Sequence, residues 1–408
     1  MPRGTAENRA AFDEETLLRE ARERTGLSDF GTDEFRPALG RLLASLREEA
    51  PLSEIGRAML RARVLESLET RLQTEDWIAR HPEILEEEIG PPLVVVGQAR
   101  TGSTMLQRVL ASDPRHHAAN WWEVRFPAPF PGTRWDAPDP RIPQAEAEVA
   151  AILEADPGQA AIHPWDARAP DEEVMLLEHS FMSYVPEAFI DVPSYRAWLT
   201  EQDWTPTYVY LRKFVQFLQW QKRQRGEVRE RWVLKTPNHL AFIDTLFEVF
   251  PGARVVWTHR DPKETIPSAA SMNHRLWEIY GDESDPAEAG RQWKERMAWA
   301  TRRCLESRER FPADRFADIW FRDALTQPVE EVERVYGVFG IEMTPAARAA
   351  MESWVRANPR DKRPAHAYTL EDFGFSEAEI EADFAEYRER FIEPRIDEPR
   401  GEPSSEPA

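Results

Sequence analysis

The chain has 408 residues, 41% of them hydrophobic, which is enough for a large α/β domain with helical additions or for two to three smaller units. Acidic residues outnumber basic residues by 73 to 52, and the net charge of −21 argues against nucleic acid and anionic membranes as partners. The single cysteine, Cys304, excludes an intramolecular disulfide and a cysteine-rich metal site, and no other set of residues has a metal-ligand spacing. Without a signal-like or membrane-spanning apolar run, the sequence predicts a soluble, cytoplasmic protein.

The N-terminal part of the chain has a helical pattern that gives way to a strand. Apolar residues recur at helical spacing between residues 12 and 90, which predicts a helical N-terminal extension over residues 1–90. A Gly-Pro-Pro sequence ends it, and the β-branched run at 93–96 predicts a strand buried on both faces, as in a parallel sheet. Gly97 ends this strand, and the apolar pattern after it predicts a helix that begins near Gly102.

Strand-like and helical segments alternate along the rest of the chain. Further strands are expected at residues 232–234, 254–257 and 316–320, and helices at 240–250, 262–272 and 287–311. This alternation predicts βαβ units and a central parallel sheet within one α/β domain over residues 91–392, with helical additions after Pro328. The tail at 393–408 is rich in Pro, Glu and Ser and is expected to be disordered.

The loop at residues 97–104, Gly-Gln-Ala-Arg-Thr-Gly-Ser-Thr, has the frame of a phosphate-binding loop between a strand and a helix. Glycines let backbone N–H groups approach phosphate oxygens, and the helix N-terminus adds the positive end of its dipole. Ser103 replaces the lysine of the ATP-binding version, and the arginine before Asp261 would repel Mg²⁺. Arg100 is placed instead to meet phosphate oxygens with a permanent charge, so the loop favours a nucleotide held without metal over a turn without a ligand.

Two motifs together resemble the sulfotransferases that use 3′-phosphoadenosine 5′-phosphosulfate. Residues 99–104 are similar to their 5′-phosphosulfate loop, P-[KR]-S-G-[ST]-T, although Ala99 replaces the proline. Arg260 ends a strand and Ser268 follows eight residues later, as in their 3′-phosphate motif. The resemblance spans residues 91–340 and looks closest to the bacterial branch and to the tyrosylprotein sulfotransferases. It implies a P-loop NTPase-like three-layer sandwich, and sulfuryl transfer to a hydroxyl or amine of a small-molecule acceptor.

The resemblance also implies roles for individual residues. Lys235, at the C-terminal end of a strand, is expected to stabilise the leaving oxygen, where α/β sheets bind their ligands. Phe321 would stack on the adenine, and a basic stretch near residue 360 would close over the 3′-phosphate, although a solvated surface loop is an equal alternative there. The expected cofactor-binding residues are Arg100, Thr101, Gly102, Ser103, Thr104, Met105, Arg260, Ser268, Phe321, Arg360 and Lys362.

The general base must be a carboxylate or an imidazole within reach of the acceptor. Glu123 stands 23 positions after Arg100, much as a catalytic Glu follows the loop arginine of tyrosylprotein sulfotransferases, and its aromatic neighbours favour a raised pKa by desolvation. His239 and His179 are alternatives. The expected catalytic residues are therefore Glu123, Lys235 and Arg100. Tryptophans that could line an apolar acceptor pocket are Trp121, Trp122, Trp198 and Trp204.

Two other functions are compatible with the loop. A P-loop small-molecule kinase would need ATP and Mg²⁺, and Ser103 in the lysine position argues against it. A non-catalytic nucleotide-binding protein would keep the loop and would lack a base.

Overall fold

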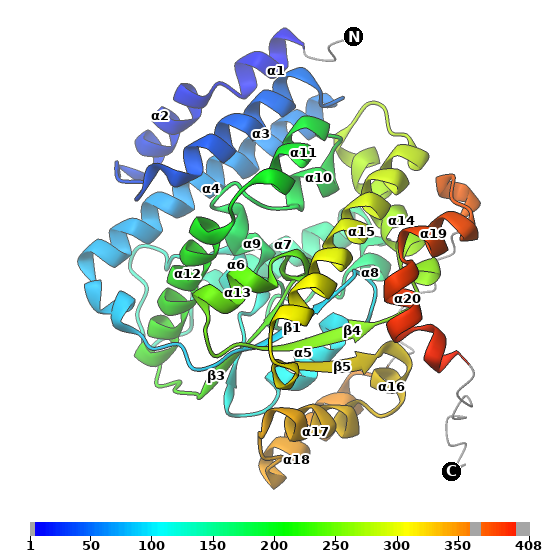
Figure 1. Cartoon of the computed structure of the whole chain (residues 1–408). Coiled ribbons are helices and arrows are strands. Elements are labelled where there is room, and N and C mark those ends of the chain that lie inside the picture. The colour runs from blue at the N-terminus through cyan, green and yellow to red at the C-terminus, as the bar shows by residue number, and fades with distance from the viewer. Residues whose placement is uncertain (1–4, 360–368, 397–408) are drawn as a thin grey trace.

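A five-stranded parallel sheet forms the centre of the molecule (Figure 1). The structure is a computed structural model and describes residues 5–359 and 369–396. The strands lie in the order β2-β3-β1-β4-β5, and every neighbouring pair is parallel. Their bounds are β1 (Leu93–Gly97), β2 (His116–His117), β3 (Arg231–Lys235), β4 (Arg254–His259) and β5 (Phe316–Trp320). The four predicted strands and the α/β class are confirmed, whereas β2 was not predicted because two histidines carry no strand pattern.

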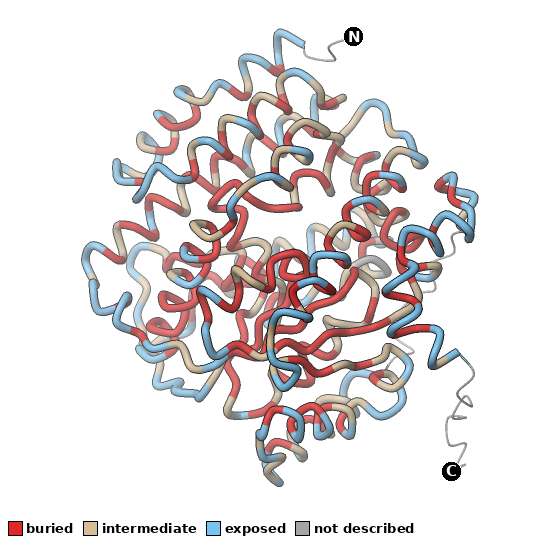
Figure 2. The backbone as a smooth tube through the Cα atoms, viewed as in Figure 1, coloured by how far each residue is buried: buried red, intermediate tan, exposed pale blue. Residues whose placement is uncertain are grey.

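The first strand shows why the sheet lies in the middle of the molecule. Leu93 and Val95 belong to the apolar cluster on one face, and Val94 and Val96 belong to the cluster on the other. Successive side chains of a strand point to opposite faces, so an unbroken apolar run is buried on both. All five residues of β1 are buried, and in Figure 2 the strands are coloured mostly as buried.

Helices cover the two faces of the sheet. On one face, α5 and the helices after β5 pack against Leu93 and Val95. These helices are α5 (Ser103–Ala111), α16 (Phe321–Thr326), α17 (Pro328–Phe339) and α18 (Pro345–Ala357). Elements whose residues join the apolar cluster on the other face are α12 (Thr205–Gln224), α13 (Ile243–Val249), α15 (Pro286–Arg310) and α20 (Ala385–Phe391). Beside α15 lie α14 (Pro262–Tyr280) and, packed on α14, α19 (Glu377–Asp383).

The long connection from β2 to β3 is built of short helices that precede α12. They are α6 (Trp121–Arg125), α7 (Arg141–Ala155), α8 (Gln159–Ile162), α9 (Val174–Glu178), α10 (Val185–Phe189) and α11 (Pro193–Glu201). Five of them have four to nine residues, which complete too few turns to display a helical pattern in the sequence, whereas α7 has 15 residues.

The predicted helical N-terminal segment forms four helices, drawn in blue at the top of Figure 1. They are α1 (Ala6–Ala11), α2 (Glu14–Thr25), α3 (Arg36–Glu48) and α4 (Glu54–Arg80). Leu17, Leu43 and Leu68 from these helices share one apolar cluster with Val94 of the sheet. The extension therefore packs into the same core as the sheet.

Near the other end of the chain, Glu393–Arg395 forms a short 3-10 helix at the start of the predicted tail. Residues 397–408 lie outside the described residues. In the part of the chain that the structure describes, no helix combines the length and the apolar character needed to cross a bilayer.

Candidate active site

The candidate site lies at the carboxyl end of the central strands. Strand β1 is flanked by β3 and β4. The later strands therefore lie on both sides of β1, with β3 and β2 on one side and β4 and β5 on the other. In open parallel sheets, ligands bind where the strand order reverses in this way. Gly97 ends β1, Lys235 ends β3 and His259 ends β4, and the predicted motifs follow or include these residues.

The loop after β1 has the backbone that a phosphate cradle needs. Arg100 and Gly102 have positive φ angles of 71° and 82°. A Cβ atom on Gly97 would stand 2.8 Å from the carbonyl oxygen of Thr258, and one on Gly102 would stand 3.0 Å from the ring of Phe321. The loop therefore requires glycine at both places. Helix α5 begins after Gly102, and no described side chain caps its N-terminus, which leaves the positive end of the helix for an anion.

Some loop side chains point into the protein. The Thr101 hydroxyl donates to the carbonyl oxygen of Gln98 at 2.7 Å and lies 2.7 Å from the Thr258 hydroxyl. Thr101 is 1% exposed, so it can offer a ligand its backbone alone. Met105 packs against the apolar cluster beside α5. The side chains of these two residues therefore shape the loop from within the protein.

The two phosphate motifs meet in space. Arg100 Nε donates to Ser268 Oγ at 3.1 Å, and Arg260 Nη1 donates to the carbonyl oxygen of Arg100 at 2.9 Å. The Arg260 guanidinium lies 4.1 Å from the ring centre of Phe321 and pairs with Glu264 at 2.8 Å. Four predicted residues, separated by up to about 220 positions, therefore form one surface beside the loop. Arg360 and Lys362 lie outside the described residues.

Lys235 projects from the end of β3 into the same region. Its side chain is 1% exposed, and its Nζ donates to Thr104 Oγ1 at 2.8 Å and to Glu172 Oε1. The backbone N–H of Lys235 donates to Glu173 Oε2 at 2.9 Å. The predicted loop and the predicted lysine are thus in direct contact, and two carboxylates that were not predicted join them.

The acidic segment Asp171-Glu172-Glu173 is the part of the site that sequence reasoning missed. Asp171 is buried and its Oδ2 lies 2.7 Å from His163 Nε2. Although burial opposes ionisation, the nearby charges of His163 and Lys235 lower the pKa of Asp171 to about 2. Asp171 Oδ1 accepts the backbone N–H of Glu172 at 2.7 Å, which fixes the peptide that carries Glu172. In a chain with 73 acidic residues, three in a row carry no distinctive pattern.

The predicted base Glu123 has other partners. Its Oε2 accepts the backbone N–H of Asn120 at 2.8 Å in a capping box at the start of α6, and its carboxylate pairs with Lys222 of α12 at 2.6 Å. Both members of this ion pair are buried. Among the contacts of the described residues, none joins Glu123 to Lys235 or to the loop.

The two alternative histidines are also committed to the interior. His239 Nε2 lies 2.7 Å from Glu173 Oε1, and its Nδ1 lies 2.8 Å from the Tyr208 hydroxyl. His179 is buried against the ring of Phe214, and burial lowers its pKa to about 3, with further lowering by the nearby arginine charges. A fully bonded ring and a ring with so low a pKa are poor proton acceptors near neutral pH.

The candidate tryptophans mainly build the core. Trp121 and Trp122 pack in an apolar cluster with α7, and Trp204 stacks on Phe242 with ring centres 4.2 Å apart. All three are at most 8% exposed, and Trp198 packs at the edge of the main cluster. These contacts give the four rings a packing role.

Comparisons with known proteins show which family and which fold the chain resembles. A family model described as "Sulfotransferase family" matches residues 91–345, which is close to the span of the resemblance found in the sequence. The solved sulfotransferase STF1 from Mycobacterium tuberculosis H37Rv is 31% identical, with a TM-score of 0.80 over 92% of this chain and 98% of that chain. The sulfotransferase STF9 from Mycobacterium avium is 28% identical, with a TM-score of 0.84 over 93% of this chain and 97% of that chain.

A curated relative carries a more specific name. The omega-hydroxy-beta-dihydromenaquinone-9 sulfotransferase Stf3 of Mycobacterium bovis and of Mycobacterium tuberculosis is 28% identical over 257 residues. The match covers 62% of this chain and 63% of the relative, so this chain spans less than two thirds of the length of the curated relatives.

Proposed function

The chain belongs to the sulfotransferase family, and from that premise we propose that it transfers a sulfuryl group from 3′-phosphoadenosine 5′-phosphosulfate to a small-molecule acceptor. The observation that carries the proposal is the meeting of Arg100, Arg260 and Lys235 at one end of the sheet. The chain as a whole carries a net charge of −21, which repels anions. An anionic ligand therefore requires a local group of cations, and these three residues form one.

The residues at the site fit a donor with phosphate groups at two positions. Arg100 and the uncapped N-terminus of α5 would hold the 5′ end, and Arg260 with Ser268 would hold the 3′-phosphate. Phe321 supports the Arg260 guanidinium and would meet the adenine. When bound, the donor supplies the sulfuryl group and a phosphate oxygen as the leaving group.

Lys235 would stabilise the charge on that leaving oxygen. Its ammonium is almost completely buried, and it is oriented by the neutral hydroxyl of Thr104 and by the carboxylate of Glu172. A cation fixed in a dry site interacts with developing negative charge more strongly than a mobile cation in water does. In an ATP-binding loop, a lysine of the loop itself would contact the phosphates. Ser103 occupies that position here, so Lys235 would supply the positive charge instead.

We propose that Glu172, rather than Glu123, accepts the proton from the acceptor. Glu172 contacts Lys235 directly, and its side chain is 22% exposed, which leaves room for an acceptor beside it. Glu123 instead binds a helix N-terminus and a buried lysine. A base must lie within hydrogen-bonding reach of the proton that it removes, and the position of Glu172 supports that role.

The acceptor we propose is a hydroxyl group on an apolar small molecule. The support is the name of the curated relative, which identifies a hydroxylated menaquinone as the acceptor of that protein. An amine on a similar molecule would use the same base.

Isothermal calorimetry tests the donor. We expect adenosine 3′,5′-bisphosphate to bind and ATP with Mg²⁺ to bind at least tenfold more weakly. Because hydrogen bonds to charged groups contribute about 1.5–3 kcal/mol, Arg260→Met should weaken bisphosphate binding by about tenfold to a hundredfold. Arg254→Met is the matched control, because Arg254 begins the strand that Arg260 follows and donates to the backbone carbonyl oxygen of Asp314, at the opposite end of the sheet. A preference for ATP with Mg²⁺ would contradict the proposed donor and favour a kinase.

A further inference from the structure

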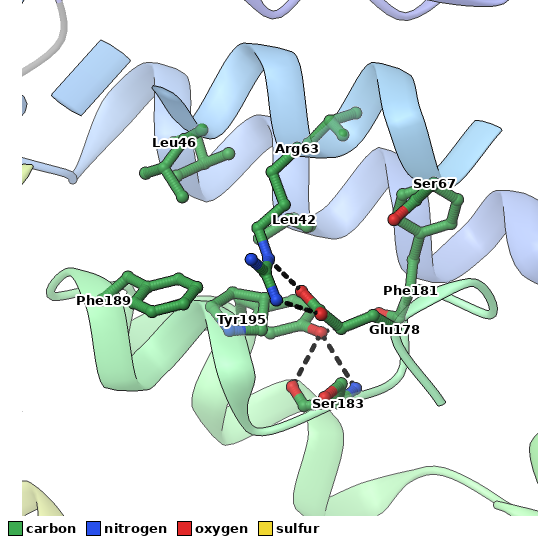
Figure 3. Close-up of a pocket in the computed structure, with 12 residues that line it drawn as sticks. Leu42, Leu46, Arg63, Ser67, Glu178, Phe181, Ser183, Phe189 and Tyr195 are labelled. Carbon is green, nitrogen blue, oxygen red and sulfur yellow. Dashed lines mark hydrogen bonds and ion pairs between the residues drawn. The ribbon is translucent and has the colours of Figure 1, made fainter. Parts of the chain in front are cut away.

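A narrow crevice separates the N-terminal helices from the chain that follows α9 (Figure 3). The space inside it is about 20 Å³, which is room for about one water molecule, so it is too small for an acceptor. Leu42, Leu46 and Leu60 of the N-terminal helices and Phe181, Phe189 and Tyr195 of the chain after α9 are among the residues that line it. Most of the lining side chains are apolar, and the two charged ones, Arg63 and Glu178, form an ion pair.

That pair joins α4 to the end of α9. Arg63 Nε donates to Glu178 Oε1 at 2.7 Å and Arg63 Nη2 donates to Glu178 Oε2, so the guanidinium grips the carboxylate at two points. Figure 3 shows the arginine reaching from the upper helix to the glutamate below. Glu178 is 8% exposed and Arg63 lies over the ring of Phe189. Two parallel bonds fix both distance and orientation.

Two turns further along α4, Arg71 holds the next residue of the same segment. Arg71 Nη1 donates to the carbonyl oxygen of His179 at 2.9 Å. The guanidinium lies 4.2 Å from the ring centre of Phe35 and 4.1 Å from that of Tyr210, and the residue is 2% exposed. An arginine buried in this way cannot move without breaking several contacts at once.

The residues held by α4 are separated from the reaction centre by one short helix. α9 begins directly after Glu173, which accepts the Lys235 N–H and contacts His239, and it ends at Glu178. Five helical residues rise about 7.5 Å, and a hydrogen-bonded helix transmits a displacement rather than absorbing it. Phe181, just beyond, has a φ of 56°, a backbone state that L side chains rarely adopt and that persists where the surroundings impose it.

We propose that Arg63 and Arg71 are positioning residues, which hold α9 so that Glu172 stays against Lys235. The proposal rests on the proposed function, in which Glu172 is the base. The N-terminal helices thereby become part of the catalytic apparatus without touching donor or acceptor. Arg63 acts through Glu178, and Arg71 acts through the backbone of His179.

The first experiment compares two arginines on α4. Arg63→Met should lower kcat for release of adenosine 3′,5′-bisphosphate by about tenfold to a hundredfold, because small misplacements of a catalytic group have effects of that size. The donor KM should stay within about twofold, since Arg100 and Arg260 are untouched. The assay uses 3′-phosphoadenosine 5′-phosphosulfate with geranylgeraniol, an isoprenoid alcohol, and with water alone as acceptor. Arg61→Met is the control, because Arg61 makes a similar two-point pair with Glu20 of α2.

A double-mutant cycle separates this idea from the proposed function. If Arg63 acts through Glu172, Arg63→Met should cost little further rate in an enzyme that already carries Glu172→Gln. Equal rate losses in both backgrounds would overturn the positioning role and leave Glu172 as the base. If Glu172→Gln alone leaves kcat unchanged, the proposed base is wrong, and the positioning role falls with it.

Amide hydrogen exchange gives a readout without turnover. In Arg63→Met, the peptide covering residues 172–179 should exchange faster, whereas Arg61→Met should leave it unchanged. Arg63→Lys, which keeps the charge and loses the two-point grip, should give an intermediate rate, and it replaces Arg63→Met if that variant fails to fold. Unchanged exchange together with unchanged kcat in Arg63→Met would overturn the proposal.

Discussion

The carboxylates of Asp171, Glu172 and Glu173 lie near Lys235, and the partners of each one limit the role that it can take. Asp171 is held ionised, with a pKa of about 2, by the charges of His163 and Lys235. Glu173 accepts a backbone N–H and contacts His239, so it braces the end of β3. Glu172 is the member of this segment that combines a contact with the Lys235 ammonium and a partly exposed side chain. This division supports the proposal that Glu172 takes the proton while its two neighbours hold the segment in place.

Substituting the two glutamates should show which of them takes part in catalysis. We expect Glu172→Gln to lower kcat by about a hundredfold or more, the usual contribution of a general base, and to cost stability as well, because it leaves the buried Lys235 ammonium without its counter-charge. Glu123→Gln should destabilise the protein by about 3 kcal/mol, because it leaves the buried Lys222 ammonium without a counter-charge, and should lower kcat less than Glu172→Gln does. Steady-state kinetics and urea unfolding of both variants measure these effects. A larger kcat loss in Glu123→Gln than in Glu172→Gln would restore Glu123 as the base.

At the scale of elements, local patterns identified the loop, the arginines and the lysine that the structure brings together, and missed the acidic segment that contacts Lys235. The loop after β1 was recognisable because its residues are contiguous, and Arg260 with Ser268 because they lie only eight residues apart, where β4 passes into α14. Glu172 was not, because its partner Lys235 lies 63 positions away and no local spacing connects them. Glu123 has the right distance in sequence from Arg100, but a capping box turns its carboxylate back onto its own helix.

The loop between β1 and α5 should be sensitive to a single methyl group. In Gly102→Ala the added Cβ would stand 3.0 Å from the Phe321 ring at a φ of 82°, so both the backbone and the support of Arg260 would be disturbed. We expect at least tenfold weaker binding of adenosine 3′,5′-bisphosphate by calorimetry. Gly226→Ala is the control, because Gly226 has a φ of 81° and a methyl group added there would have nothing within 4 Å. It should cost about 1–2 kcal/mol of stability and leave binding unchanged. Equal binding losses in both variants would refute the local explanation.

For the whole molecule, the N-terminal helices and the sheet form one packed body. Periodicity in the sequence showed that residues 12–90 are helical, but a helical pattern does not state which surface its apolar face meets. The structure shows Leu68 of α4 and Val94 of β1 in one apolar cluster. Arg71, also of α4, is buried against the segment that follows α9. We therefore expect the N-terminal helices and the candidate site to unfold together in one cooperative transition.

The same packing buries histidines in their neutral form, which makes the stability of the whole molecule depend on pH. Burial lowers the pKa of His116 to about 4 and those of His117 and His179 to about 3. In the unfolded chain these groups have pKa values near 6.5. Between about pH 6.5 and pH 4 the unfolded state therefore binds more protons than the folded state, and stability must fall as the pH falls.

Each such histidine should contribute up to about 1.4 kcal/mol per pH unit to this slope, so the three together give about 4 kcal/mol per pH unit at most. Urea unfolding at pH 6.5, 6.0 and 5.5 measures the slope with little contribution from carboxylates, whose pKa values in the unfolded chain are about 4. His117→Gln should reduce the slope by about one histidine's share, because His117 is 2% exposed beside Trp232 and lies near the Lys222 charge. The stability that His117→Gln loses through altered packing is measured separately at pH 7.5, where histidine is neutral in the folded and in the unfolded state. An unchanged slope would mean that the His117 ring is protonated inside the folded protein, which would contradict the neutral, desolvated environment on which the argument depends.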